Sequence, residues 1–357
     1  MTTIYLICAA ESEDGIFRIA GGQRDYSLTS YGLIQAKTLR AFFARHQVSA
    51  VCSSPQKSAL DTAGAIWDQT DITPVCSESL REISTGIWEG AMWGNLAYEE
   101  PRKVEAFRSY DPFWRIPEAE SFPEAVSRLQ EALLSFAAAH PEDVFAAVTH
   151  RHLAGALLNH LLPDGHQKLP VPSPCTVAVL QADGGNLQTV SVTDGQDLLS
   201  SIDPASVRQR TVPDFDTDAC CYLLREIEYG DTFVEAIQSV WEESGENRHF
   251  DRNTLINDAS RKTTYIGFVE QTPACFLQTG PLPGWITLLV VHPGCRNLGV
   301  GAQMIGLATM NAQNGGSDTL SILLPPDNLH RSFFEHHGFM SEGFTDDGRE
   351  LMTKHLS

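Results

Sequence analysis

The stretches TIYLICA at residues 3–9 and VSAVCS at residues 48–53 decide how the first half of the chain folds. Both are short and apolar, as buried strands are. Between them Leu33, Ala36 and Leu39 recur at helical spacing. The pattern therefore predicts a β–α–β unit.

The same alternation continues along the first half. It predicts helices over residues 59–67, 122–139 and 152–162, and strands over 144–148, 176–180 and 187–192. Strands and helices in alternation are typical of a mostly parallel sheet that helices cover on both faces. We therefore expect an α/β domain in this half.

A polar segment, DPASVRQRTVPDFDTD at residues 203–218, divides the chain. It contains prolines and shows no periodicity, as linkers do. A length of 357 residues suits two domains, which we place at residues 1–202 and 219–357. In the second domain the pattern predicts strands over residues 221–227, 265–270, 274–278, 285–291 and 319–324, and helices over 231–243, 251–260, 298–313 and 330–336.

The chain is acidic in both halves. Up to Asp216 it carries 16 Lys and Arg against 27 Asp and Glu, and beyond that residue 9 against 18. A nucleic-acid ligand needs a basic surface that displaces phosphate counterions, and the sequence has no Lys/Arg cluster. The charge therefore argues against a nucleic-acid partner and favours cationic or neutral small ligands.

The eight cysteines and the apolar runs indicate the compartment. The cysteines form no C-x-x-C pair, and most lie in strand-like runs where cysteine packs as a small hydrophobic residue. The longest apolar runs fall short of the roughly 18 residues that a membrane span needs, and the start of the chain lacks a basic secretion signal. We expect a cytoplasmic protein with no membrane partner.

In the second half, RNLGVG at residues 296–301 follows an apolar strand and opens a helix. The first N–H groups of a helix lack partners within the helix, and its positive end attracts anions. Gly299 and Gly301 let the backbone approach a phosphate closely. Taken alone, the motif also fits a glycine-lined turn between a strand and a helix.

The residues around this motif make the second half similar to the GNAT-type acetyltransferases. VVHP at residues 290–293 leads into the R-x-x-G-x-G run, and DNLHRSFFEHHGF at residues 327–339 resembles the family's N-x-x-A-x-x-F-Y-E-x-x-G-F signature. The resemblance covers roughly residues 220–357. It implies a GNAT-fold mixed α/β sheet, with the diphosphate of acetyl-CoA across the helix start and the pantetheine arm added to residues 289–291 as a strand.

The resemblance assigns a set of residues to acetyl-CoA, the co-substrate. They are Leu289, Val290, Val291, Arg296, Asn297, Leu298, Gly299, Val300, Gly301, Ala302, Asn328 and Phe334. Where Phe334 stands the family usually has a tyrosine suited to protonating the departing CoA thiolate, and where Asp327 stands it commonly has Asn. Phenylalanine cannot donate a proton, but a thiolate with a pKa of ~8.5 can leave without a dedicated acid.

The acceptor amine must be neutral when it attacks, so the site should hold a base or a water chain that leads to one. The sequence leaves Glu270, His292, His330 and His337 open as catalytic candidates, with His336 nearby. Each of them is also compatible with a surface or capping role.

Short motifs along the first half occur in a fixed order. They are GQRDYSLT at residues 22–29, SSP at 53–55, LRE at 80–82, GIWEG at 86–90, ES at 120–121 and VTH at 148–150. This order is similar to that of the histidine phosphatase (phosphoglycerate-mutase-like) superfamily over about residues 1–200. The resemblance implies an α/β/α sandwich.

The catalytic groups of that superfamily are missing. Its first strand ends in Arg-His-Gly, whose His takes the phosphoryl group, and here the triplet is Cys8, Ala9 and Ala10. A second phosphate-binding arginine is replaced by Ser58, which leaves Glu82 and His150 in a vestigial pocket. Bidentate arginine contacts hold a phosphoryl group, so we expect no phosphatase activity.

Two other uses of this pocket have weaker support in the sequence. Cys8 stands at the arginine position, and no neighbouring cation remains to lower its pKa as a nucleophile would need. His150 and His152, with Glu11 and Glu82, could be imagined as metal ligands, but H-x-H after a strand is usually structural, and we expect no metal.

The sequence therefore predicts two α/β domains with different roles. The resemblance of the second to GNAT-type acetyltransferases implies that it transfers acetyl from acetyl-CoA to an amine of a small molecule or a lysine side chain, with a cationic acceptor favoured by the charge. The first is a catalytically dead phosphatase-like domain that serves as a scaffold, a homodimerisation surface or a ligand-binding module. The alternative is a non-enzymatic regulatory protein that binds acetyl-CoA or another ligand, with both sites degenerate.

Overall fold

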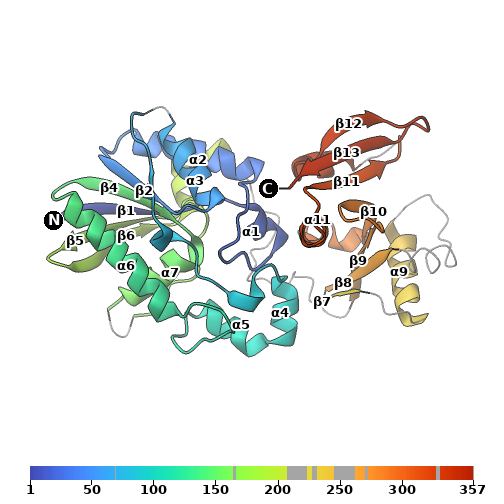
Figure 1. The fold of residues 1–357 in the computed structure, drawn as a ribbon, viewed down its shortest axis with the longest axis horizontal. Helices are drawn as coiled ribbons and strands as arrows, with labels where there is room; N and C mark the ends of the chain where they lie inside the picture. Colours follow the sequence, from blue (N-terminus) through green and yellow to red (C-terminus); the bar gives the residue numbers. More distant parts are fainter. Residues whose placement is uncertain are drawn as a thin grey trace. The chain divides into compact units, whose positions relative to one another are not determined.

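The structure is a computed structural model that describes residues 1–68, 70–163, 166–206, 223–226, 231–244, 262–269, 272–326 and 330–356. The chain divides into two compact units (Figure 1). The first comprises Met1–Glu13, Ala20–Gly90 and Glu100–Gln209, and the second Asp14–Ile19, Ala91–Glu99 and Arg210–Ser357. Most of the predicted linker 203–218 and all of the predicted helix 251–260 lie outside the described residues, so the predicted domain limits remain predictions.

The first unit is built on a six-stranded sheet with the order β3-β2-β4-β1-β5-β6. Its strands are β1 (Thr2–Cys8), β2 (Ala50–Ser53), β3 (Val75–Cys76), β4 (Val144–Thr149), β5 (Val177–Asp183) and β6 (Asn186–Thr193). The first four run parallel, and β5 and β6 are antiparallel at one edge. The prediction of a mostly parallel sheet is confirmed.

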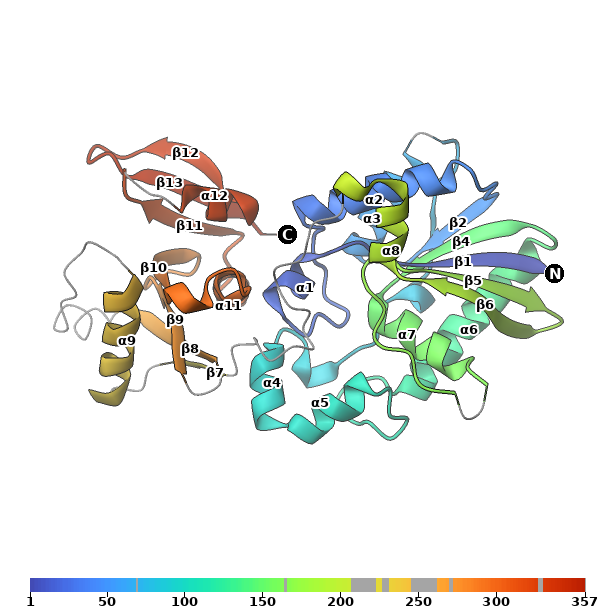
Figure 2. The ribbon, with the colours of Figure 1, turned by 180° about the vertical axis from the view of Figure 1, so that it is seen from behind.

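Helices cover both faces of this sheet (Figures 1 and 2). One face packs against α2 (Ser30–Phe43), α3 (Lys57–Trp67) and α8 (Gly195–Ile202), through a core that includes Leu39, Ile66 and Leu199. The other packs against α6 (Phe122–Ala139) and α7 (Arg151–His160), where the rings of Phe136 and Phe145 lie 4.7 Å apart. The result is the expected α/β/α sandwich.

Sequence patterns do not reveal three short helices, α1 (Glu13–Phe17), α4 (Trp93–Glu99) and α5 (Pro101–Arg108). Each has at most eight residues, too few for a helical period to stand out. None of the described helices of the chain is long and apolar enough to cross a membrane.

The second unit has a seven-stranded mixed sheet with the order β12-β13-β11-β10-β9-β8-β7. Its strands are β7 (Leu223–Glu226), β8 (Thr263–Val269), β9 (Thr272–Thr279), β10 (Trp285–Val291), β11 (Thr319–Leu324), β12 (Met340–Phe344) and β13 (Glu350–His355). Helix α9 (Asp231–Ser244) packs through Ile237, Val240 and Trp241 against Phe276 and Val290. The other helices are α11 (Val300–Asn314) and α12 (Arg331–His336).

Strands β10 and β11 diverge in the middle of this sheet. They pair in parallel only at Trp285 with Ser321 and at Ile286 with Ile322. On its other side β10 stays paired with β9 as far as Val291, after a bulge between Ile286 and Leu288. The carboxyl halves of β10 and β11 therefore separate, and beyond Ile286 no strand within the described ranges lies beside the β10 edge that points away from β9.

Candidate functional site

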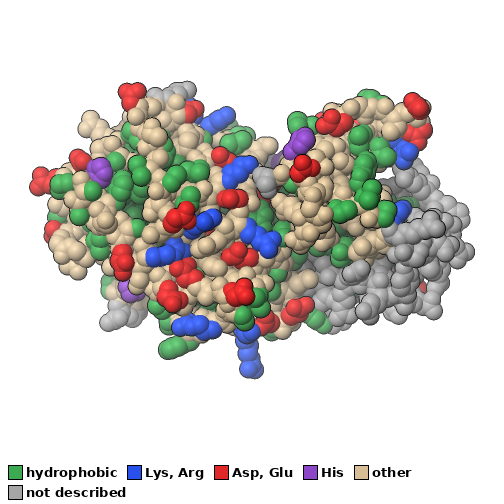
Figure 3. Space-filling view, viewed as in Figure 1, with side chains coloured by type: hydrophobic (Ala, Val, Ile, Leu, Met, Phe, Trp, Pro, Cys, Tyr) green, Lys and Arg blue, Asp and Glu red, His purple; other side chains and the backbone are tan. Residues whose placement is uncertain are grey.

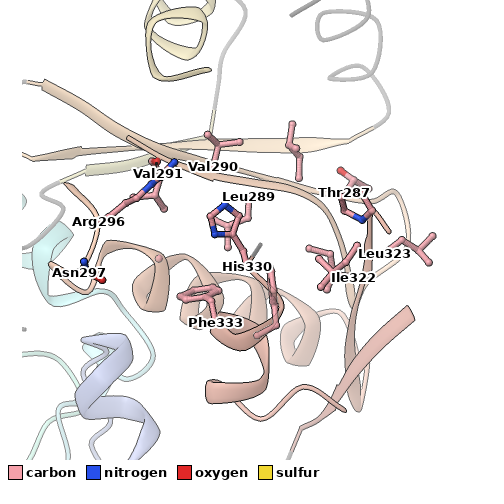
Figure 4. Close-up of a pocket in the computed structure, with 15 residues that line it drawn as sticks. Thr287, Leu289, Val290, Val291, Arg296, Asn297, Ile322, Leu323, His330 and Phe333 are labelled. Carbon is pink, nitrogen blue, oxygen red and sulfur yellow. Dashed lines mark hydrogen bonds between the residues drawn. The ribbon is translucent and has the colours of Figure 1, made fainter. Parts of the chain in front are cut away.

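A cleft of about 290 Å³ opens where β10 and β11 separate, next to α11 and α12 (Figure 4). Most of its walls are apolar side chains from the two strands and α12. Its lining residues are Thr287, Leu288, Leu289, Val290, Val291, Arg296, Asn297, Gly301, Ile322, Leu323, Leu324, Pro325, His330, Phe333 and Phe334. The cleft lies at the carboxyl ends of two parallel strands, where open α/β sheets usually bind ligands.

The start of α11 forms one end of the cleft. Asn297 and Gly299 have left-handed backbone conformations, with φ of 63° and 80°, and they turn the chain from β10 into the helix. Gly299 is the N-cap, a position where glycine adopts this conformation without strain. The Nε of Arg296 donates to the carbonyl oxygen of Val291 at 3.3 Å, which holds the guanidinium beside the helix start. A helix start and a cation at one place suit an anionic group such as a diphosphate.

Gly301 keeps this end open because it has no side chain. A Cβ at this position would lie 3.0 Å from the ring of Phe333 on the opposite wall. Such a contact is too close for ordinary packing, so any larger residue would narrow the entrance or displace Phe333.

The structure brings together many of the residues predicted to bind acetyl-CoA. Those that line the cleft are Leu289, Val290, Val291, Arg296, Asn297, Gly301 and Phe334. Leu298, Gly299, Val300 and Ala302 belong to the turn and to the first turn of α11. The side chains of Val300 and Ala302 are buried, so these two residues can offer only backbone groups to a ligand. Asn328 lies outside the described residues.

Sequence reasoning missed about half of the cleft wall. The additional lining residues are Thr287, Leu288, Ile322, Leu323, Leu324, Pro325 and Phe333. The apolar run of β11 is typical of any buried strand, and no pattern in it shows that the strand leaves its neighbour after two pairs. A cleft that arises from strand divergence therefore leaves little trace in the sequence.

Of the catalytic candidates, His330 lies in the cleft, where it reaches from the start of α12 toward Leu289 of β10 (Figure 4). His292 does not line the cleft, and its Nδ1 accepts the N–H of Gly294 at 3.1 Å. The buried His337 also lies elsewhere, with its ring 4.7 Å from that of Phe333. Glu270 lies outside the described residues.

In the first unit, the residues predicted to form a vestigial pocket lie near the carboxyl ends of β1, β2 and β4. Cys8 ends β1, and the N–H of Ala9 donates to the carbonyl of Thr149 at 2.8 Å. His150 is the N-cap of α7, and Ser58 lies in the first turn of α3. Burial raises the pKa of the Cys8 thiol to about 12, so the thiol stays protonated at neutral pH.

The carboxylate of Glu82 accepts hydrogen bonds from backbone N–H groups at the start of α7. Its Oε1 accepts the N–H groups of Ile83 and Leu153, each at 2.8 Å. Its Oε2 accepts the N–H of His152 at 3.0 Å and lies 3.3 Å from the Nδ1 of that residue. Burial alone would raise the pKa of Glu82, but the hydrogen bonds and nearby histidine charge lower this pKa to about 2. Such a strong acid is deprotonated at neutral pH and cannot serve as a proton donor.

Gln56, which sequence reasoning did not assign to this region, lies among these residues and is buried. Its Oε1 accepts the N–H of Glu82 at 2.7 Å, and its Nε2 donates to the carbonyls of Gly22 and Arg24 at 3.2 and 3.1 Å. Its own N–H donates to the Oγ of Ser54. The glutamine thus ties three loops together.

His150 is neutral in this setting. Its Nε2 lies 2.9 Å from the Oγ of Ser54. Burial lowers the pKa of His150 to about 4. Within the part of the chain that the structure describes, no three His, Cys, Asp or Glu side chains gather as a metal ion would require.

Comparison with known proteins identifies the first unit. Residues 4–195 match the model of the histidine phosphatase superfamily (branch 1). The chain is 30% identical over 144 residues to Putative phosphoserine phosphatase 2 of Hydrogenobacter thermophilus, covering 40% of this chain and 71% of the relative. It is 28% identical over 162 residues to Probable phosphoglycerate mutase GpmB of Proteus mirabilis, covering 45% and 75%.

A solved structure agrees with this match. Bacillus stearothermophilus YhfR superposes with a TM-score of 0.50 at 25% identity, over 53% of this chain and 96% of that chain. The α/β/α sandwich and these matches define a phosphoglycerate-mutase-like domain. The chain belongs to the histidine phosphatase superfamily, and the resemblance of its first half is confirmed.

Proposed function

We propose that the second unit is an acetyl-CoA-dependent N-acetyltransferase of the GNAT type, and that the first unit is a phosphatase fold without phosphatase activity. The divergence of β10 and β11 carries the first part of the proposal. It leaves a cleft with an unpaired strand edge along one wall and the start of α11 at one end.

Acetyl-CoA matches the chemistry of each part of this cleft. Its diphosphate suits the start of α11 beside Arg296, and the amides of its pantetheine arm can pair with the free edge of β10 as an added strand. The apolar walls from Leu289, Leu323 and Phe333 suit the methylene groups of the same arm. A free phosphate or a nucleotide alone would use only the first of these features.

One observation favours binding without turnover as a second candidate. Phe334 lines the cleft with a buried apolar ring and has no proton to donate to a leaving thiolate. A protein that only senses acetyl-CoA would keep the cleft and would need no group to move protons.

Two measurements on the full chain separate these functions. Calorimetry with CoA and acetyl-CoA tests the cleft, and release of free thiol tests turnover with spermidine, kanamycin and a lysine-containing peptide. An acetyltransferase binds acetyl-CoA and releases thiol with at least one amine, whereas a sensor binds without release. A chain that binds neither CoA nor acetyl-CoA would exclude both functions.

For the first unit, we expect no hydrolysis of p-nitrophenyl phosphate by the wild-type chain or by Ala9→His alone. The single change restores a nucleophile, but Cys8 and Ser58 still leave the pocket without its two arginines. The triple variant Cys8→Arg, Ala9→His, Ser58→Arg restores both cations and is the comparison. Hydrolysis by the wild type that a His150→Ala substitution abolishes would show that the pocket is active. Without activity, the unit is left with a role as a scaffold, a dimerisation surface or a ligand-binding module.

A further inference from the structure

The acyl transfer proposed above requires that one proton move within the cleft. The lone pair of a neutral amine attacks the thioester carbonyl, a C–N bond forms, and the C–S bond breaks with its electron pair on sulfur. The nitrogen then sheds one proton and the sulfur gains one. Some group in or near the cleft must carry that proton, because the two atoms are bonded to the same carbon and exchange protons poorly by direct transfer.

Few side chains of the cleft can do this. Among its described lining residues, the ionisable side chains are Arg296 and His330. A guanidinium does not give up its proton in proteins, and Phe334 has none to give. Imidazole both accepts and donates a proton near neutral pH, which makes His330 the suitable group on this wall.

The position of His330 suits this task. It is the N-cap of α12 and lines the same cleft as Phe334. Its ring projects between α12 and Leu289 of β10, in the middle of the cleft rather than at the anion-binding end near Asn297 (Figure 4). The thioester of an acetyl-CoA molecule bound along β10 would lie next to this ring.

Charged groups around His330 come from three elements. Arg296 lies in the loop before α11, and Arg331 is its neighbour on α12. Arg331 forms ion pairs with Glu335 of the same helix at 2.6 Å and with Glu350 of β13 at 3.0 Å. The described charged groups near His330 thus include two cations, one of which is paired with two carboxylates.

We propose that His330 is a catalytic residue that carries this proton from the amine nitrogen to the CoA sulfur, an assignment that rests on the proposed acetyltransferase function. The neutral imidazole takes the proton as the C–N bond forms. The imidazolium then gives it to the thiolate, which is the more basic of the two, and His330 returns to its starting state.

The test compares His330→Gln with His336→Gln in the full chain. Glutamine keeps hydrogen-bonding groups but cannot take a proton, and His336 is an exposed histidine of the same helix that does not line the cleft. Acetyl-CoA affinity is measured by calorimetry. The pH dependence of kcat is measured by thiol release with the amine that turns over best among spermidine, kanamycin and a lysine-containing peptide.

We expect His330→Gln to bind acetyl-CoA within about threefold of wild type and to lose about 10²–10⁴-fold in kcat at pH 7. The midpoint of the fall of kcat on the acid side should shift in this variant and stay unchanged in His336→Gln. His330→Asn serves as a second variant if the first is unstable.

Two results would overturn the assignment and leave the proposed function standing. One is an unchanged kcat and pH profile in His330→Gln, and the other is a loss confined to acetyl-CoA affinity. Binding of acetyl-CoA without turnover of any of the three amines would reject the acetyltransferase and this assignment together, and no binding would reject the cleft as a CoA site.

Discussion

At the scale of single residues, the first unit contains a carboxylate, that of Glu82, whose oxygens hold backbone groups in place. Glu82 stands in a motif of the histidine phosphatase superfamily, yet its two oxygens accept three backbone N–H groups and face a histidine ring. Gln56 adds a further bridge to its backbone. These contacts join separate loops of the first unit at the start of α7.

These buried groups predict how the stability of the first unit depends on pH. The folded-state pKa of His150 is lowered to about 4 and that of Glu82 to about 2, both below their ordinary values of 6.5 and 4.5. As the pH falls, the unfolded chain takes up each proton first. The free energy of unfolding should therefore decrease between pH 6.5 and 4 because of His150 and between pH 4.5 and 2 because of Glu82, by at most about 1.4 kcal/mol per pH unit for each group.

Hydrogen exchange of the amides in β1 and β4, which belong to the first unit, measures this quantity for that unit. His150→Gln should flatten the upper part of the curve and Glu82→Gln the lower part. His160→Gln, an exposed histidine at the end of α7, is the control and should leave the curve unchanged. Equal slopes in all four proteins would mean that these groups do not couple to folding.

The sequence shows some of this chemistry and hides the rest. Cys8, Ala9 and Ser58 stand out once the motifs are compared by their order, and the predicted loss of the nucleophile and of two cations rests on these three residues. The hydrogen bonds of Glu82 are not visible, because its partners His152 and Leu153 lie about 70 residues further along the chain. Tertiary packing decides which carboxylates are held by hydrogen bonds and which are not.

At the scale of single elements, the start of α11 is the feature on which the proposed cofactor site depends. Its backbone N–H groups can reach a diphosphate only while Gly301 leaves the space beside Phe333 open. Gly301→Asp adds both bulk and negative charge there. We expect acetyl-CoA to bind at least tenfold more weakly to this variant, a loss of at least ~1.4 kcal/mol, as measured by calorimetry.

Asn314→Asp is the matched control for that experiment. It adds the same charge to the other end of the same helix, at an exposed position away from the cleft. Its acetyl-CoA affinity should equal that of the wild type. If Gly301→Asp also binds normally, the start of α11 is not the site of the diphosphate.

Periodicity predicted the longer elements well and the shorter ones poorly. The limits of α6, β10 and β11 agree with the predicted ranges because each has a strong apolar pattern and clear ends. Helix α6, for instance, begins with a capping box of Ser121 and Glu124. Strands β12 and β13 were not predicted. The sequence of β12 is MSEGF, whose side chains are largely exposed and show no alternation of buried and exposed positions.

At the scale of the whole molecule, the net charge of −20 bears on the choice of acceptor. Asp and Glu side chains are spread over the face shown in Figure 3 rather than gathered at one place, so their attraction for a cation acts over long distances. We expect a cationic amine to be the preferred acceptor. Its KM should then rise with salt, because the Debye length shortens from ~30 Å at 0.01 M to ~8 Å at 0.15 M.

Thiol release at two salt concentrations measures this effect. The control is a neutral amine of similar size, such as a hydroxylated primary amine that is assayed at a pH above its pKa. Its KM should change little between the two salt concentrations. A KM for the cationic amine that does not depend on salt, or a preference for anionic acceptors, would contradict electrostatic attraction as the basis of selectivity.

The short contact between β10 and β11 also affects how the second unit can deform. Its sheet consists of two ladders, β7 to β10 and β11 to β13, that share a seam of two residue pairs. Helix α11 contacts strands of both ladders, β9 and β10 in one and β11 in the other, so this helix joins the ladders in addition to the seam. A ligand that bridges the free edges of β10 and β11 would add a further mechanical connection across the cleft.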